Sequence, residues 1–306
     1  MSTSPSLSAP SLSAPSPSAP PAAPAARPSP WREIGVFLGA TAGLLTLTTA
    51  VAAAADADVA HVDQEPPLVQ ALLFGQALIP LVAAVLARLV TAGTLRRPGW
   101  GFRRTSWRSL GTAWLWALLP TLAAGGLLWA TGLAGFASEG LTPTVALGLT
   151  VLVLPYVALA LAEDVGWRGL LVQRLAEVAG PRTVVLVSGL AWSLFHWPLV
   201  LFLGGAPAGI PVPFALLCLT VGTTSLGAAL ASMQLRWGIW PGVLAHAVLN
   251  ALLYHVLAPL TADSGPTEWL STETGAAGAV TLLLAALAWW RVAPLRRSPD
   301  GGTRAA

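Results

Sequence analysis

Residues 141–169 read LTPTVALGLTVLVLPYVALALAEDVGWRG, an apolar run that ends in two acids and an arginine. The run from Leu141 to Ala162 carries no charge, and it is long enough to cross a membrane as a helix. A charged side chain at membrane depth costs about 3 kcal/mol on insertion scales. Glu163, Asp164 and Arg168 fall within six positions of a chain that is only 9% charged, so this stretch indicates a functional polar site inside a membrane protein.

The composition of the whole chain supports that class. Its 306 residues are 55% hydrophobic, with a mean hydropathy of +0.70 and an isoelectric point near 10.0. All 16 basic residues are arginines that lie between apolar runs, so they indicate membrane topology and no nucleic-acid partner. The absence of lysine favours a GC-rich, bacterial source. The single cysteine, Cys218, excludes an internal disulfide and a cysteine-based metal site.

The order of apolar runs predicts an all-α polytopic membrane protein with about eight transmembrane helices. A Ser/Pro/Ala-rich tail at 1–30 is expected to be disordered, because it buries too little apolar surface to offset its ordering entropy. The domain division is 31–143 for the first three helices, 144–258 for the core, and 259–306 for the last helix and an arginine-rich tail. The expected spans are 34–55, 68–90, 110–132, 144–162, 183–203, 214–233, 238–258 and 275–292.

Charge fixes the expected orientation. Every arginine lies at the chain ends, in alternate loops or at the span ends that flank them, whereas the opposite loops hold eight acids and no base. Cytoplasmic loops collect positive charge, so both termini are predicted to lie in the cytoplasm of a plasma-membrane protein. The eight acids are Asp56, Asp58, Asp63, Glu65, Glu139, Asp263, Glu268 and Glu273.

Polar residues on the fourth, fifth and seventh spans are predicted to meet. Glu163, His196 and His246 lie 11, 14 and 10 residues from the cytoplasmic arginines Arg174, Arg182 and Arg236, roughly 15 to 21 Å deep along a straight helix. Asn250 follows His246 by one turn, so both side chains can point at one spot. His61 and His255 are interpreted as non-catalytic.

Spacing also predicts how the charges in the first stretch are arranged. Asp164 and Arg168 are four residues apart with the acid first, the favourable order for an ion pair along a helix. This pairing leaves Glu163, about 100° around the helix, without an obvious local partner. An unpaired intramembrane carboxylate is a functional residue by default.

At these residues the chain resembles the CAAX-protease and bacteriocin-processing (CPBP, or Abi) intramembrane proteases, which include the type II CAAX prenyl endopeptidases. The family pattern is Glu-Glu-x-x-x-Arg, then Phe-x-x-x-His, then His-x-x-x-Asn on successive helices. It corresponds here to Glu163–Arg168, Trp192–His196 and His246–Asn250. Asp164 stands in place of the second Glu, and Trp192 stands in place of Phe.

The resemblance implies proteolysis of a membrane-associated protein or peptide at an intramembrane site. Glu163 would act as general base on water with the help of His196, while His246 and Asn250 would donate to the oxyanion. Asp164, Arg168 and Trp192 would support them. A metalloenzyme is the alternative, with Glu163, His196 and His246 as ligands of a divalent ion such as zinc. A non-catalytic scaffold for immunity or sorting, and a small-molecule transporter, are the other readings.

Overall fold

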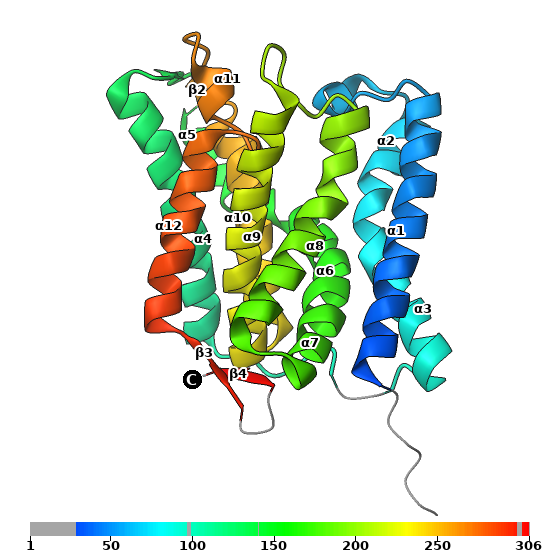
Figure 1. Cartoon of the computed structure of the whole chain (residues 1–306). Coiled ribbons are helices and arrows are strands. Elements are labelled where there is room, and N and C mark those ends of the chain that lie inside the picture. The colour runs from blue at the N-terminus through cyan, green and yellow to red at the C-terminus, as the bar shows by residue number, and fades with distance from the viewer. Residues whose placement is uncertain (1–28, 97–98, 140, 299–301, 306) are drawn as a thin grey trace, which may run out of the picture.

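The computed structural model describes residues 29–96, 99–139, 141–298 and 302–305 (Figure 1). All but the last two residues of the tail expected to be disordered therefore lie outside the described residues. The described chain is a bundle of long helices whose axes run between two ends of the molecule. The first half comprises α1 (Pro30–Ala54), η1 (Val59–Gln64), α2 (Pro67–Gly75), η2 (Gln76–Leu78), α3 (Ile79–Ala92), α4 (Trp107–Thr131), β1 (Gly135–Phe136) and α5 (Leu141–Gly148).

The second half holds the three sequence motifs. Two of its segments, η3 and η4, are π-helical turns that continue directly from an α-helix. Its elements are α6 (Val153–Asp164), η3 (Val165–Val172), α7 (Gln173–Val178), α8 (Pro181–Phe202), α9 (Val212–Trp237), α10 (Ile239–Leu252), η4 (Leu253–Leu257), β2 (Thr261–Ala262), α11 (Thr267–Leu270), α12 (Ala276–Val292), β3 (Leu295–Arg297) and β4 (Thr303–Ala305).

Local sequence explains where the long helices begin and end. Pro30 and Pro181 occupy the first turns of α1 and α8, where the missing N–H is not needed. Ser106 caps α4, with its hydroxyl accepting a hydrogen bond from the Ser109 N–H at 3.2 Å. Gly93 and Gly132 end α3 and α4 in the left-handed conformation that glycine adopts most easily.

Seven helical segments of the described chain are long and apolar enough to cross a membrane, so the protein is a multi-pass membrane protein. Apart from the last, each expected span has one of these segments as its counterpart. The last span forms α12, which has only 17 residues, or ~25 Å of helix against the ~30 Å of a typical hydrocarbon layer. The eight-span topology with cytoplasmic termini stays a prediction, although α1 begins and α12 ends at the same end of the bundle (Figure 1).

Two short pairs of antiparallel strands depart from an entirely helical fold, one between distant segments of the chain and one as a hairpin. Strands β1 and β2 pair antiparallel with Gly135 opposite Ala262, and β3 pairs with β4 with Arg296 opposite Arg304. The hairpin of β3 and β4 is formed by the segment expected to be an arginine-rich tail. It docks on the bundle where the Thr303 hydroxyl donates to the Ala179 carbonyl at 2.7 Å.

Helices α9 and α10 are the most enclosed part of the bundle. Helix α9 packs against α8 and α12, while α10 packs against α4, α6 and α9. Ala245, Ala247 and Ala251 of α10 are fully buried, which lets neighbouring backbones approach closely. The motif on α10 is therefore held from several sides.

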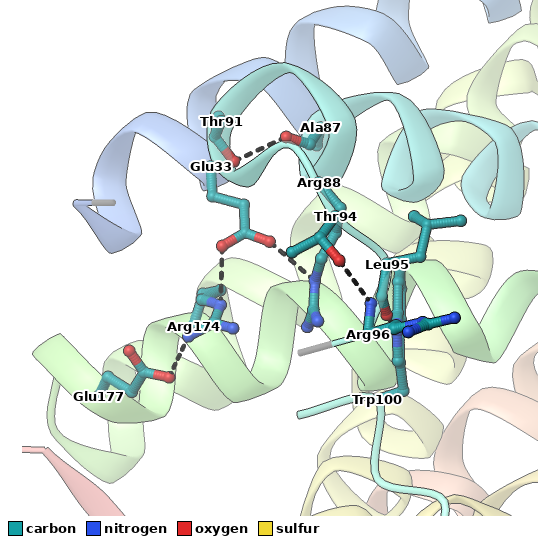
Figure 2. A network of polar contacts seen from close by, with 10 residues as sticks. All are labelled: Glu33, Ala87, Arg88, Thr91, Thr94, Leu95, Arg96, Trp100, Arg174 and Glu177. Atoms are coloured by element: carbon teal, nitrogen blue, oxygen red, sulfur yellow. Dashed lines mark hydrogen bonds and ion pairs between the residues drawn. The ribbon is translucent and has the colours of Figure 1, made fainter. Parts of the chain in front are cut away.

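A buried ionic cluster ties the N-terminal helices to the second half of the chain (Figure 2). Glu33 of α1 lies 2.9 Å from both Arg88 of α3 and Arg174 of α7, and Arg174 also pairs with Glu177. The Arg88 guanidinium stacks 4.1 Å above the Trp100 ring. Arg88 was counted among the arginines that flank the loop after the second expected span, and Glu33 was given no role, but the structure buries both.

This cluster predicts that two Glu→Gln substitutions lower the free energy of unfolding by very different amounts. Glu33→Gln should lower the free energy of unfolding by about 3 kcal/mol, because it leaves two enclosed arginines short of a counter-charge. Glu177→Gln should cost less than about 1 kcal/mol, since Glu177 is half exposed. Denaturant titration of the purified protein measures both values. Equal losses in the two variants would contradict the assignment.

Candidate active site

The first motif lies where an α-helix changes into a π-helix. Glu163 and Asp164 are the last two residues of α6, and Arg168 lies in the middle of η3. All eight residues of η3 are buried. A π-helical turn is rare, and it is found frequently at functional sites.

The close approach of η3 to α3 depends on a glycine. A Cβ atom added to Gly166 would lie 2.5 Å from the Pro80 carbonyl oxygen and 2.6 Å from the Pro80 Cβ. Gly169 similarly faces the Trp100 carbonyl, which would be 3.0 Å from an added Cβ. The small residues of this motif therefore bring its backbone against the N-terminal part of the chain.

The ion pair expected from the spacing is confirmed. Asp164 and Arg168 lie 2.9 Å apart, and their side chains are 0% and 3% exposed. The Nδ1 atom of His246 lies 3.6 Å from the same Asp164 oxygen, which is close enough for a charge interaction but too long for a hydrogen bond. The first and third motifs thus meet at Asp164.

Trp192, in the second motif, contacts residues of all three motifs. Its indole N–H donates to Glu163 Oε2 at 2.9 Å, and the Arg168 guanidinium lies 3.8 Å above its ring. The His196 and His246 rings pack against the same indole in T-shaped arrangements, with centroid separations of 5.6 and 5.1 Å. Glu163, which the sequence left without a partner, therefore has one from α8.

The remaining motif residues are less enclosed. The Nδ1 atom of His196 donates to the Trp192 carbonyl at 2.8 Å, because a carbonyl can only accept. A neutral His196 ring then keeps Nε2 as an acceptor. Asn250 is half-buried one turn beyond His246, and the structure gives its side chain no hydrogen bond to a described residue.

The residues proposed as metal ligands do not form a ligand set in this arrangement. Within the described ranges, no three His, Cys, Asp or Glu side chains gather closely enough to hold a metal ion. The Trp192 indole contacts Glu163, His196 and His246 alike. The geometry gives no support to a metal-binding role for these three residues.

The other two histidines lie outside this cluster. His61 precedes α2 and bonds Asp58 at 2.8 Å, a contact that raises the pKa of the imidazole and lowers the pKa of the carboxyl. His255 lies in η4, where its Nε2 atom is 3.1 Å from the Tyr156 hydroxyl. These partners are not residues of the three motifs, and the non-catalytic interpretation of both histidines stays a prediction.

The type II CAAX prenyl endopeptidase Rce1-like family matches residues 143–252, a segment that runs from α5 to the end of α10 and contains all three motifs. This segment is an Rce1-like domain. The family is one of proteases, which agrees with the resemblance drawn from the motifs. A comparison with curated proteins gave no match.

The structure adds contacts of the Rce1-like domain that its motifs do not reveal. Pro80 and Trp100 lie against the first motif from outside the domain, and Glu33 pairs with Arg174 inside it. Trp192 was predicted to be a supporting residue, but its hydrogen bond to Glu163 was not. The sequence did hold a signal for this hydrogen bond, because Trp192 stands where the family pattern has Phe. That exchange adds an N–H donor beside the carboxylates.

The contact at Gly166 predicts that a single methyl group is harmful. Gly166→Ala should lower the free energy of unfolding by about 1 to 3 kcal/mol, because the new Cβ overlaps Pro80 and forces η3 away from α3. Gly39→Ala in α1 is the control, since a Cβ there meets nothing within 4 Å. Denaturant titration should find Gly39→Ala neutral or stabilising. A Gly166→Ala protein as stable as Gly39→Ala would contradict the packing argument.

Proposed function

We propose that the Rce1-like domain is an intramembrane endopeptidase that hydrolyses a peptide bond of a membrane-associated protein or peptide. The observation that carries this proposal is the convergence of three helices on Trp192. It brings a carboxylate, two imidazoles and a buried ion pair into one cluster. The family match supports the reaction class, and the proposal adds the residues and their roles.

Glu163 is the general base in this proposal. Its carboxylate takes a proton from a water molecule, and the oxygen of that water attacks the carbonyl carbon of the scissile bond. The proton then passes from Glu163 to the leaving amine as the carbon–nitrogen bond breaks. The Trp192 N–H fixes the Glu163 carboxylate at 2.9 Å, so the base is oriented before substrate arrives.

His196 positions the attacking water, whereas His246 and Asn250 stabilise the oxyanion. The Nε2 acceptor of His196 is suited to hold the second hydrogen of the attacking water, because Nδ1 is committed to the Trp192 carbonyl. His246 and Asn250 donate to the oxygen of the tetrahedral intermediate. Asp164 and Arg168 support the site by pairing with each other, which leaves Glu163 for the chemistry.

The proposed setting is a plasma membrane, with the arginine-rich loops and both termini in the cytoplasm. The site would then lie below the cytoplasmic surface and be reached from that side. This orientation rests on the distribution of arginines and of acids between alternate loops. A CAAX-type C-terminus is one candidate substrate, by family kinship alone.

The first test compares the C-termini of membrane proteins in cells that carry wild type, Glu163→Gln or Glu268→Gln. Glu268 lies in α11, at the other end of the bundle from the arginine-rich loops, and is exposed (Figure 1). New C-termini should appear with wild type and Glu268→Gln and fall by at least about 100-fold with Glu163→Gln, because the general base is lost. Quantitative proteomics at matched protein levels measures this. The same C-termini in all three strains would favour a non-catalytic scaffold.

The second test isolates the hydrogen bond to Glu163. Trp192→Phe keeps the aromatic contacts with Arg168 and the histidines but removes the N–H donor. We expect kcat to fall about tenfold with KM nearly unchanged, the size of a lost hydrogen bond to a charged group. Kinetics on a peptide identified by the proteomic comparison measure both constants.

The matched control for this test is Trp197→Phe. Trp197 also lies in α8, and its indole donates to the Thr220 hydroxyl at 3.1 Å, away from Glu163. Its replacement removes the same kind of hydrogen bond and should leave kcat near the wild-type value. Equal losses of kcat in the two variants would show that the Trp192 N–H has no special part in the reaction.

A further inference from the structure

A positively charged pocket lies away from the proposed protease site, at the end of the bundle where α4 begins and α9 ends. Its volume is about 240 Å³. Its lining includes Arg103, Arg104 and Arg236, the hydroxyls of Ser106 and Ser109, and the indole of Trp237. Among the residues that the structure describes, no acidic residue lines it. None of these residues has a place in the proposed reaction.

Arg103 is positioned without being neutralised. It donates to the backbone carbonyls of Gln234 and Leu235 at 2.9 and 3.2 Å, and Arg236 donates to the carbonyl of Pro294 at 3.3 Å. The Gln234 and Leu235 carbonyls carry no formal charge, so their bonds orient the Arg103 guanidinium group and leave its charge in place. Within the described residues, no carboxylate forms an ion pair with Arg103 or Arg104.

Two further features make the pocket suited to an anion. Helix α4 begins at Trp107, beside the pocket, so the positive end of a 25-residue helix adds to the field of the arginines. The Ser109 hydroxyl already donates to the Ser106 carbonyl at 2.8 Å, whereas the Ser106 hydroxyl can turn its hydrogen toward a phosphate oxygen. Guanidinium groups recognise the same oxygens by paired hydrogen bonds.

The aromatic residues place the pocket at the level of lipid headgroups. Trp237 lines it, and the neighbouring Trp107 side chain is 86% exposed at the start of a transmembrane segment. Tryptophan at the ends of spans marks the boundary between hydrocarbon and water. Basic pockets at that level bind the headgroups of anionic lipids.

We propose that this pocket binds a phosphate group, supplied by the headgroup of an anionic phospholipid. Arg103 and Arg104 belong to the loop before α4, whereas Arg236 and Trp237 end the helix that precedes α10. A bound phosphate would therefore join the N-terminal helices to the Rce1-like domain. The same loop already reaches the start of α10, where the Ile239 N–H donates to the Gly101 carbonyl at 2.9 Å.

The test measures lipid binding to the full chain in detergent by native mass spectrometry. Wild type should bind phosphatidylglycerol in preference to phosphatidylcholine, and Arg104→Gln should weaken phosphatidylglycerol binding about fivefold, the effect of one arginine near a headgroup. Arg108→Gln is the matched control. Arg108 is exposed one turn away in the same charged region but does not line the pocket.

Each outcome decides the proposal. Loss of binding in Arg104→Gln but not in Arg108→Gln supports a specific pocket. Competition by inorganic phosphate at millimolar concentration would keep the phosphate chemistry but assign the site to a soluble anion. Equal losses in both variants, or no preference for phosphatidylglycerol over phosphatidylcholine, would overturn the proposal, because the charge of the whole face would then account for any binding.

Discussion

Charge enclosed in an apolar bundle has to be paired, and the two buried ionic groups of this protein show how the pairing shapes the fold. Asp164 and Arg168 pair within one segment, so they are satisfied wherever that segment lies. Glu33 instead pairs with arginines from two other helices, and it is satisfied only when those helices come together. The first group stabilises a motif locally, while the second fixes how α1, α3 and α7 are arranged around it. Leaving either group unpaired would cost several kcal/mol, which is a large share of a typical stability.

The arrangement of the site follows from these constraints. The local pair satisfies Asp164 and Arg168 within their own segment, and Trp192 contacts groups from all three motifs. A large aromatic ring can hold a cation over its face and pack edge-to-face with two imidazoles while its N–H donates to a carboxylate. One side chain thereby sets the relative positions of groups that come from α6, α8 and α10.

Much of the fold and of the candidate site could be predicted from the sequence, because the relevant signals are local. Apolar run lengths predicted the bounds of most helical segments within a few residues, but the fourth segment continues from the predicted end at Ala162 to Val178. Four-residue spacing predicted the Asp164–Arg168 pair. Glu33 and Arg88 could not be paired from sequence, since 55 positions separate them and each sits at the end of its own apolar run. The π-helical form of η3 was also beyond prediction, because it depends on packing against Pro80 as well as on local residue preference.

The cluster around Glu33 has a consequence for how the chain is divided. The family match begins at residue 143, yet Arg174 finds its buried counter-charge on α1, and the backbone at Gly166 rests on Pro80. A unit recognised by sequence similarity is thus smaller than the unit that can fold. The first three long helices are part of the scaffold of the Rce1-like domain and not a separable anchor. Substitutions in these helices and in the motif segment are therefore expected to be coupled in their effects. Grafting the matched segment onto another membrane protein would leave the ion pairs of that segment incomplete.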